Sequence, residues 1–326
     1  MGCARRGSLH ALAATLLVIS TALPSLAATD TVTSLADDSS PGTLRSVIAA
    51  AGAGDTIVFG VTGTITLTQG YLQINQNLTI SGPGAASLAI SGNNTSGVFV
   101  ITGDTVSISG LTIENGNQAG AGGGIFSTAT LTVSNCTFLN NTTTSALAAG
   151  GAIQSLGLGG LTVNNSTFSG NSVPAGYGGA IASYTGLTVG NSTFSGNSDG
   201  VNGGAIWNIG TATVSYSTFS GNSASSGGGI YEYEYGTLTL KSTLLAAQPS
   251  GGNCYSAAGT TMTSAGYNLS DDASCTSFTQ AGDQNNVTGA ASDLSGGAPG
   301  LSVTSGATSS NVNICSMSTS PCLMVM

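Results

Sequence analysis

The sequence predicts an all-β solenoid, in which one chain coils repeatedly and stacks short parallel strands, with a short helix closing the N-terminal end. Two motifs that recur about every 25 residues between positions 122 and 245 support this fold. The first is Gly-Gly-(Ala/Gly)-Ile, whose isoleucines are Ile125, Ile153, Ile181, Ile206 and Ile230. The second is Thr-Phe followed by an asparagine, at Asn141, Asn171, Asn197 and Asn222. A fixed period of this length is typical of stacked units that bury one shared core.

Residues 1–27 have the pattern of an export signal. Two arginines precede an apolar run at residues 11–23, and Ser25-Leu-Ala27 is a small-residue cleavage motif. A membrane anchor needs about 20 apolar residues, whereas this run is shorter and Pro24 follows it. We expect cleavage and a mature chain without a transmembrane segment. We expect that chain to be secreted or to stay at the cell surface, where it could be associated with an outer membrane.

Loss of the signal changes the charge of the chain. Only Arg45 and Lys241 then remain against thirteen Asp and Glu residues, a net charge of −11, and the only histidine, His10, is lost. Nucleic acids bind clusters of cationic side chains that neutralise phosphates. The composition therefore excludes nucleic acid as a partner.

Residues 28–60 predict an N-terminal cap. Thr43 is a suitable N-cap residue, and Leu44, Val47 and Ile48 follow at the spacing of one apolar helix face. The β-branched and aromatic residues 55–59 predict the first strand. A helix laid over the first coil would protect a sheet edge that otherwise invites aggregation.

Residues 61–250 predict the coils themselves. Short strands such as Leu131-Thr-Val133 and Leu161-Thr-Val163 recur, and because side chains alternate across a strand, Leu and Val point inward and Thr points outward. We expect one outward column of threonines. Ordered threonines can match ice, but Thr is also a favourable residue on an exposed strand, and a single column without paired Thr-x-Thr ranks favours this second interpretation.

The repeated asparagines predict a structural ladder. Asn141, Asn171, Asn197 and Asn222 occupy equivalent turn positions, where they can hydrogen-bond to neighbouring coils. Asn-x-Ser/Thr sequences also recur, for example at Asn135, and would be acceptors for glycosylation. In so regular a repeat we favour the structural role.

The cysteines divide into a buried one and a C-terminal group. Cys136 lies in a repeat strand and is expected to pack as a small apolar side chain. In an exported protein disulfides can form, and we expect Cys254 to pair with Cys275, whereas pairing of Cys315 with Cys322 is open. Residues 251–290 would form a C-terminal cap, and residues 291–326 a low-complexity Ser/Thr/Gly tail that is truncated or shifted in frame.

The motifs resemble those of a known family. Gly-Gly-Ala-Ile with Asn-Ser-Thr-Phe-Ser-Gly-Asn-Ser is similar to the right-handed parallel β-helix (pectin-lyase-like) superfamily, in its branch with polymorphic outer-membrane-protein repeats. The segments 34–38, 42–46 and 55–59 resemble the N-terminal CSLREA module, and residues 253–275 resemble the choice-of-anchor Q domain of bacterial surface proteins. The resemblance covers residues 30–285 and implies a single-stranded right-handed β-helix displayed on a bacterial surface.

Many members of this superfamily cleave acidic polysaccharides, so catalysis needs separate consideration. The lyases resemble one another in using an Arg or Lys base with calcium, and the hydrolases in using clustered Asp with His and Arg or Lys. The mature chain has no histidine and two cations. Glu232 and Glu234, two residues apart on a predicted strand, would share one face at about 6.6 Å between Cα atoms, near the separation used by inverting glycosidases. A solvated pair of glutamates on a terminal coil is the favoured interpretation.

No metal site or cofactor is expected. The doublets Asp37-Asp38 and Asp271-Asp272 lie in turn-like sequence, where solvation or an incidental Ca²⁺ contact is the expectation.

Aromatic residues give the best candidate for ligand binding. Trp207 and Tyr231 each follow a repeat isoleucine, and Tyr184 and Tyr233 lie nearby. If this column faces solvent, the rings form an exposed surface for sugar rings or apolar groups. Alternatively, they form an end cap that closes the core, and the two interpretations remain open.

These observations favour a non-catalytic protein, adhesin-like or structural, that contacts glycans or the surface proteins of a host or matrix. The alternative is a polysaccharide-acting enzyme, either a glycoside hydrolase or a lyase, that uses Glu232 and Glu234.

Overall fold

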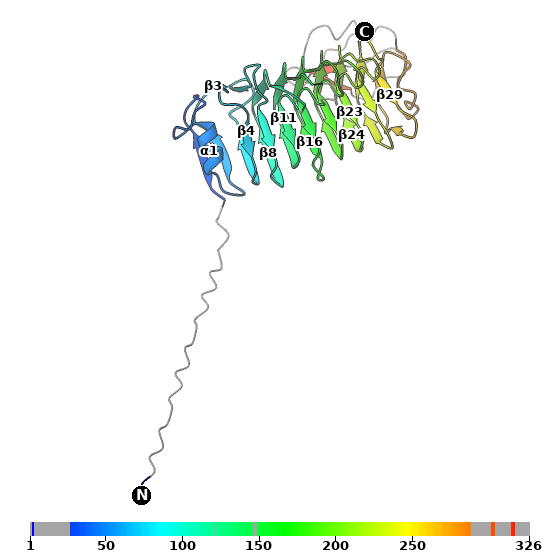
Figure 1. The fold of residues 1–326 in the computed structure, drawn as a ribbon. Coiled ribbons are helices and arrows are strands. Elements are labelled where there is room, and N and C mark those ends of the chain that lie inside the picture. The colour runs from blue at the N-terminus through cyan, green and yellow to red at the C-terminus, as the bar shows by residue number, and fades with distance from the viewer. Residues whose placement is uncertain are drawn as a thin grey trace.

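The computed structural model describes residues 2, 27–120, 122–145, 149–287, 301–303 and 314–316. Stacked coils form an elongated rod, with α1 at one end and β29 near the other (Figure 1). The predicted all-β solenoid is confirmed, because every strand pair in the coils is parallel and joins strands of successive coils. The predicted export signal lies outside the described residues, apart from Gly2 and Ala27.

Three long sheets run along the rod, and we name them by the residues that recur in them. The threonine sheet contains β1 (Thr29–Val32), β2 (Thr56–Phe59), β5 (Leu78–Ser81), β8 (Thr105–Ser109), β12 (Thr130–Ser134), β16 (Leu161–Asn164), β20 (Leu187–Gly190), β24 (Thr211–Ser215), β27 (Thr237–Lys241) and β30 (Thr261–Ser264). The phenylalanine sheet contains β3 (Gly63–Thr66), β6 (Leu88–Ser91), β9 (Thr112–Glu114), β13 (Thr137–Leu139), β17 (Thr167–Ser169), β21 (Thr193–Ser195), β25 (Thr218–Ser220), β28 (Leu244–Ala246) and β31 (Leu269–Ser270).

The isoleucine sheet contains β4 (Leu72–Ile74), β7 (Phe99–Ile101), β11 (Ile125–Ser127), β15 (Ile153–Ser155), β19 (Ile181–Ser183), β23 (Ile206–Asn208), β26 (Ile230–Glu232) and β29 (Cys254–Ser256). A short fourth sheet contains β10 (Asn117–Gln118), β14 (Thr142–Thr143), β18 (Ser172–Val173) and β22 (Ser198–Asp199). Separately, β32 (Leu301–Val303) pairs with β33 (Ile314–Ser316) in antiparallel fashion.

The helix α1 (Leu44–Ala50) lies at the N-terminal end of the rod, as the sequence predicts. The Thr43 hydroxyl accepts a hydrogen bond from the Ser46 N–H, which caps the helix. Leu44 and Ile48 are buried in the same core as the strands. Because β1 and β2 belong to the threonine sheet, residues 28–60 are continuous with the coils that follow.

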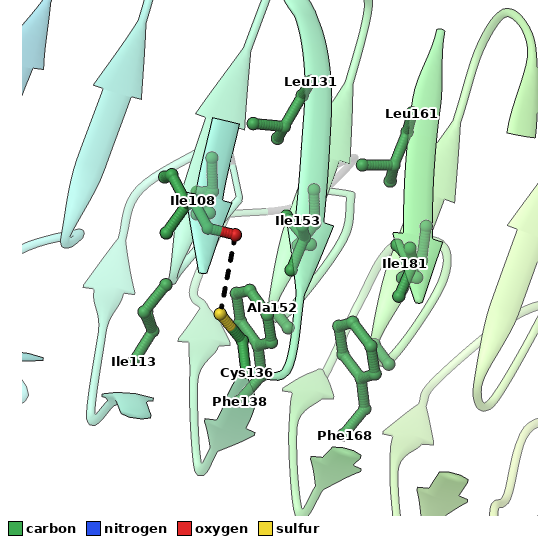
Figure 2. Close-up of a cluster of buried hydrophobic side chains, with 14 of the residues drawn as sticks. Ile108, Ile113, Leu131, Cys136, Phe138, Ala152, Ile153, Leu161, Phe168 and Ile181 are labelled. Carbon is green, nitrogen blue, oxygen red and sulfur yellow. Dashed lines mark hydrogen bonds between the residues drawn. The ribbon is translucent and has the colours of Figure 1, made fainter. Parts of the chain in front are cut away.

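The core is built from the inward positions of the three sheets. Figure 2 shows Ile153 and Ile181 between Leu131 and Leu161 on one side and Phe138 and Phe168 on the other, all within one buried cluster. The inward phenylalanines stack from coil to coil with ring centroids 4.7 Å apart, which is about the distance between neighbouring strands. Cys136 is buried in this core and its thiol donates to the Ile108 carbonyl oxygen over 3.7 Å (Figure 2).

The asparagines 141, 171, 197 and 222 form a continuous buried ladder. The Nδ2 of each of the first three donates to the Oδ1 of the next, at 2.9, 2.9 and 2.8 Å. Each Nδ2 also donates to a backbone carbonyl oxygen of the preceding coil. Gln248 continues the ladder, because its Oε1 accepts from the Asn222 N–H. The ladder therefore satisfies backbone groups at the buried turn of the coils that it joins.

The outward face of the threonine sheet carries a longer column than the sequence predicts. Ten positions in register, one on each strand, hold nine threonines and one serine: Thr29, Thr56, Thr79, Ser107, Thr132, Thr162, Thr188, Thr213, Thr239 and Thr263. The expectation of a single column is wrong, because β12, β24, β27 and β30 each carry a second outward threonine two residues earlier. In the second column Gly160 and Gly186 hold the corresponding positions, directly before β16 and β20.

The C-terminal end of the described coils is closed by a loop that a disulfide fastens. Cys254, the first residue of β29, is joined to Cys275, 21 residues later. Cys275 and Phe278 are buried against the main core. Residues 251–287 continue all three sheets through β29, β30 and β31, so the predicted C-terminal cap begins as an ordinary coil. In the part of the chain that the structure describes, no helix is long and apolar enough to span a membrane.

Candidate functional site

The candidate site lies on the outward face of the isoleucine sheet. Each inward isoleucine is followed by an outward residue, and these residues are in register from strand to strand. From β15 to β29 this column is Gln154, Ala182, Trp207, Tyr231 and Tyr255. The alternation of side chains along each short strand therefore brings aromatic residues of three successive coils together outside the rod.

Six aromatic residues gather here, and we call them the outer aromatic cluster: Tyr177, Tyr184, Trp207, Tyr231, Tyr233 and Tyr255. The Trp207 ring lies 5.2 Å from that of Tyr177, 5.0 Å from that of Tyr184 and 5.6 Å from that of Tyr233, measured between centroids. Tyr231 stacks on Tyr255 at 4.8 Å. The cluster packs separately from the main core, so it does not close the end of the rod.

The predicted exposed surface of Trp207 and Tyr231 is wrong in one respect. Trp207 is 4% exposed and Tyr231 is 7% exposed, so these two rings form the floor of the cluster. Tyr184 and Tyr233 follow the ends of β19 and β26, and their half-buried rings pack over the floor together with Tyr177. Tyr255 is 44% exposed. The surface of the cluster that meets solvent is therefore made mainly of tyrosine rings. They come from turns and from β29, the C-terminal strand of the isoleucine sheet.

Sequence reasoning missed two members of the cluster. Tyr255 occupies the register position of Trp207 and Tyr231 one coil later, so extending the repeat by one period would have found it. Tyr177 lies in a turn, where it bridges to Ala149 and Asn202, and no periodic signal marks it.

The two glutamates of the alternative catalytic site are separated. Glu232 is the last residue of β26, points inward and is fully buried. Glu234 is exposed in the following turn, with φ of 21°. The prediction that both share one face is wrong, because the strand ends at Glu232 and the chain turns before Glu234. A pair of carboxylates flanking one substrate bond is not formed.

Glu232 belongs to a column of buried polar residues inside the rod. Ser155, Ser183, Asn208 and Glu232 occupy the third position of successive strands, and all are fully buried. Asn208 Nδ2 donates to both carboxylate oxygens of Glu232, at 2.9 and 3.1 Å. Burial raises the pKa of Glu232 to about 8, although the Asn208 hydrogen bond acts in the opposite direction. Glu232 therefore carries its proton through most of the neutral range.

The aspartate doublets are occupied by protein donors. Asp37 forms an ion pair with Arg45 over 2.8 Å and accepts from the Thr68 and Gln69 N–H groups. Asp271 accepts from the Ala247 N–H, and Asp272 accepts from the Asn253 and Ser274 N–H groups. These carboxylates fix turns. Among the described residues, no group of three or more acidic, His or Cys side chains could hold a metal ion.

An open pocket of about 640 Å³ adjoins the cluster at the C-terminal end of the rod. Its lining includes Tyr255, Ser256, Thr260, Met262 and Ser274. Tyr255 thus belongs both to the pocket and to the outer aromatic cluster. No titratable side chain lines the pocket apart from that tyrosine, which suits contact with neutral groups better than acid–base chemistry.

The stacking of parallel strands in long sheets along one rod identifies the protein as a parallel β-solenoid. The family described as "Right handed beta helix region" matches residues 62–245. The chain therefore belongs to this right-handed β-helix family. Among solved structures, a mutant pectin methylesterase in complex with a hexasaccharide is similar at 12% identity and a TM-score of 0.30, over 83% of this chain and 95% of that one. No curated protein matches the chain.

Proposed function

We propose that the protein is a secreted or cell-surface, non-catalytic binding rod, adhesin-like in its action, whose outer aromatic cluster contacts glycans or the surfaces of a host or matrix. The observation that carries this proposal is the clustering of six aromatic rings on one outer face, drawn from successive coils. Exposed apolar patches on soluble proteins mark interaction sites. The finer resemblance to CSLREA, polymorphic outer-membrane and choice-of-anchor proteins supports display on a bacterial surface.

The rod supports this role because it holds the rings rigidly. Trp207 and Tyr231 are placed by backbone pairing of β19, β23 and β26, and beneath them lie the stacked isoleucines of the core. A rigid aromatic surface loses little conformational entropy when it binds. Tyrosine and tryptophan also combine a large apolar area with a polar group, which suits contact with sugars or with protein surfaces.

The chemistry of the described residues favours binding over catalysis. The mature chain lacks histidine. Of the two candidate carboxylates, Glu232 is buried inside the rod and Glu234 is exposed in the turn that follows. A polysaccharide-acting enzyme stays the alternative. It would be supported if Glu232→Gln or Glu234→Gln abolished cleavage of a glycan by the wild-type protein.

The test compares binding by the mature protein and by a Tyr233→Ala/Tyr255→Ala double variant, on glycan arrays and on immobilised matrix proteins. We expect the double variant to bind at least about tenfold more weakly, because each substitution removes an aromatic ring that the ligand would contact. The matched control is Tyr71→Ala/Tyr216→Ala, because these tyrosines are 45% and 49% exposed but lie outside the cluster. Equal binding by both double variants would overturn the proposal.

A further inference from the structure

Trp207 has a buried polar atom that no protein group satisfies. Its indole Nε1 is inaccessible to solvent and has no hydrogen-bond partner. Buried tryptophan N–H groups ordinarily find an acceptor, and leaving one unpaired costs about 1–3 kcal/mol. An unpaired donor of this kind in a surface cluster calls for an explanation.

A second unpaired atom lies in the same outward column. The Oε1 of Gln154, a residue 7% exposed, also lacks a partner. Gln154 and Trp207 lie two strands apart, roughly 9.6 Å between backbones, and Ala182 is the residue between them. Ala182 contributes nothing beyond Cβ and is itself fully buried within the aromatic cluster, so the two polar side chains flank the smallest side chain of the column.

The two unpaired atoms are complementary to one kind of ligand group. The indole N–H only donates, and the carboxamide oxygen only accepts. A hydroxyl group does both, so hydroxyls of one ligand can satisfy both atoms. A sugar presents hydroxyls at the edge of its ring and C–H groups on its faces, and the surrounding tyrosine rings supply the apolar surface that those faces need.

The charges around the cluster select an uncharged ligand. In the described chain, Arg45 is paired with Asp37 at the N-terminal end, and Lys241 projects from the threonine sheet. The exposed charge beside the cluster is Glu234, whose carboxylate hydrogen-bonds to Tyr233 and raises the pKa of that phenol. A uronate would meet a like charge here and find no cation.

We infer that the outer aromatic cluster is a subsite for an uncharged oligosaccharide, in which ligand hydroxyls over Ala182 pair with Trp207 Nε1 and Gln154 Oε1. This inference rests on the proposed binding function and names its ligand. Tyr177 and Tyr184, both half-buried, contact Trp207 from the outer side. Because both polar atoms are inaccessible to solvent, the inference requires side chains of the cluster to move aside before a ligand reaches them.

Trp207 is the only tryptophan, so its fluorescence reports directly on the subsite. The experiment titrates the mature protein with neutral hexasaccharides of glucose, mannose and xylose, and with a galacturonate hexasaccharide. We expect a neutral hexasaccharide to change the fluorescence and to bind, by calorimetry, at least about tenfold more tightly than the uronate. Preference for the uronate would overturn the inference.

Trp207→Phe is the decisive variant, because it keeps an aromatic ring and removes the N–H, together with part of the contact area of the indole. Calorimetry should show about a tenfold loss of affinity for the neutral ligand, and the melting temperature reports separately on the packing that the smaller ring loses. Ala182→Leu, which places a larger side chain between the two polar side chains, should also abolish binding. If Trp207→Phe binds like the wild type, the subsite is refuted.

The outcomes separate this inference from the proposed function. Loss of matrix binding in the Tyr233→Ala/Tyr255→Ala variant, with no binding of any neutral hexasaccharide by the wild type, would leave the binding rod standing and refute the sugar subsite. Unchanged binding to every surface in that double variant would refute the binding rod as well.

Discussion

Replacing Glu232 with glutamine should stabilise the protein at neutral pH. The folded-state pKa of Glu232 is raised to about 8 from its usual 4.5, mainly by burial. The folded protein therefore binds this proton more tightly than the unfolded chain. The resulting stabilisation is fully present below pH 4.5 and is lost as the pH rises toward 8. At about 1.4 kcal/mol per pH unit, the loss between pH 4.5 and 7 is about 3 kcal/mol.

Glutamine removes this dependence, because a carboxamide does not ionise and its oxygen can still accept from Asn208 Nδ2. The Asn208 carboxamide that contacts Glu232 also carries an oxygen without a hydrogen-bond partner, and this oxygen is the acceptor that we expect for the new NH₂ group. The free energy of unfolding should therefore differ between Glu232→Gln and wild type by an amount that grows by about 1.4 kcal/mol per pH unit between pH 5 and 8.

The measurement is urea unfolding of both proteins at half-unit steps from pH 4 to pH 9. Glu234→Gln is the control, because it removes the same charge from an exposed position two residues away. Other titrating groups cancel in the difference between variant and wild type. Parallel curves for Glu232→Gln and wild type would show that Glu232 is not held neutral, and the reasoning from burial would fail.

Further changes test other parts of the structure. Asp199→Asn should stabilise the protein at pH 7 and not at pH 4, because burial raises the pKa of Asp199 to about 7; urea unfolding at both pH values checks this. Asn171→Ala should cost at least about 3 kcal/mol by urea unfolding, because it leaves the Asn141 and Phe138 backbone groups without the partners that the ladder supplies. Reducing the disulfide between Cys254 and Cys275 should lower stability by about 3 kcal/mol, as expected for a closed loop of this length. Thermal hysteresis of the protein should stay at the buffer level, because Gly160 and Gly186 interrupt the second threonine column in two consecutive coils.

The fold could be predicted because its information is periodic. Ile125 and its successors, the Thr-Phe pairs and the asparagines recur at one step, and residues that recur at one step of a solenoid lie directly above one another. The register of the inward phenylalanines and the asparagine column both follow from spacing alone. The helix at Leu44–Ala50 was visible for a different reason, since a cap residue and an apolar face are local signals.

The site was less predictable because it depends on turns. The sequence placed Trp207 and Tyr231 in one outward column, but the rings that cover them come from Tyr177, Tyr184 and Tyr233, next to strand ends. The same difficulty affected the glutamates: alternation put Glu232 and Glu234 on one face only if the strand continued, and it ends at Glu232. Periodicity identifies which residues share a column, but not which loop side chains fold over it.

Some of the buried polar groups without hydrogen-bond partners lie on the strands that carry the candidate site. In the N-terminal coils, the third position of the isoleucine sheet is Ile74 and Ile101, and both are buried. In later coils the same position becomes serine, then Asn208 and Glu232, with buried oxygens left unpaired. The strands β23 and β26, which carry Asn208 and Glu232 on their inward side, carry Trp207 and Tyr231 on their outward side. Both faces of these strands therefore depart from the usual pattern of apolar residues inside and polar residues outside. Natural proteins depart from such rules mainly at functional sites. This coincidence supports the proposal that the rod binds its ligand at β23 and β26, where the aromatic cluster is found.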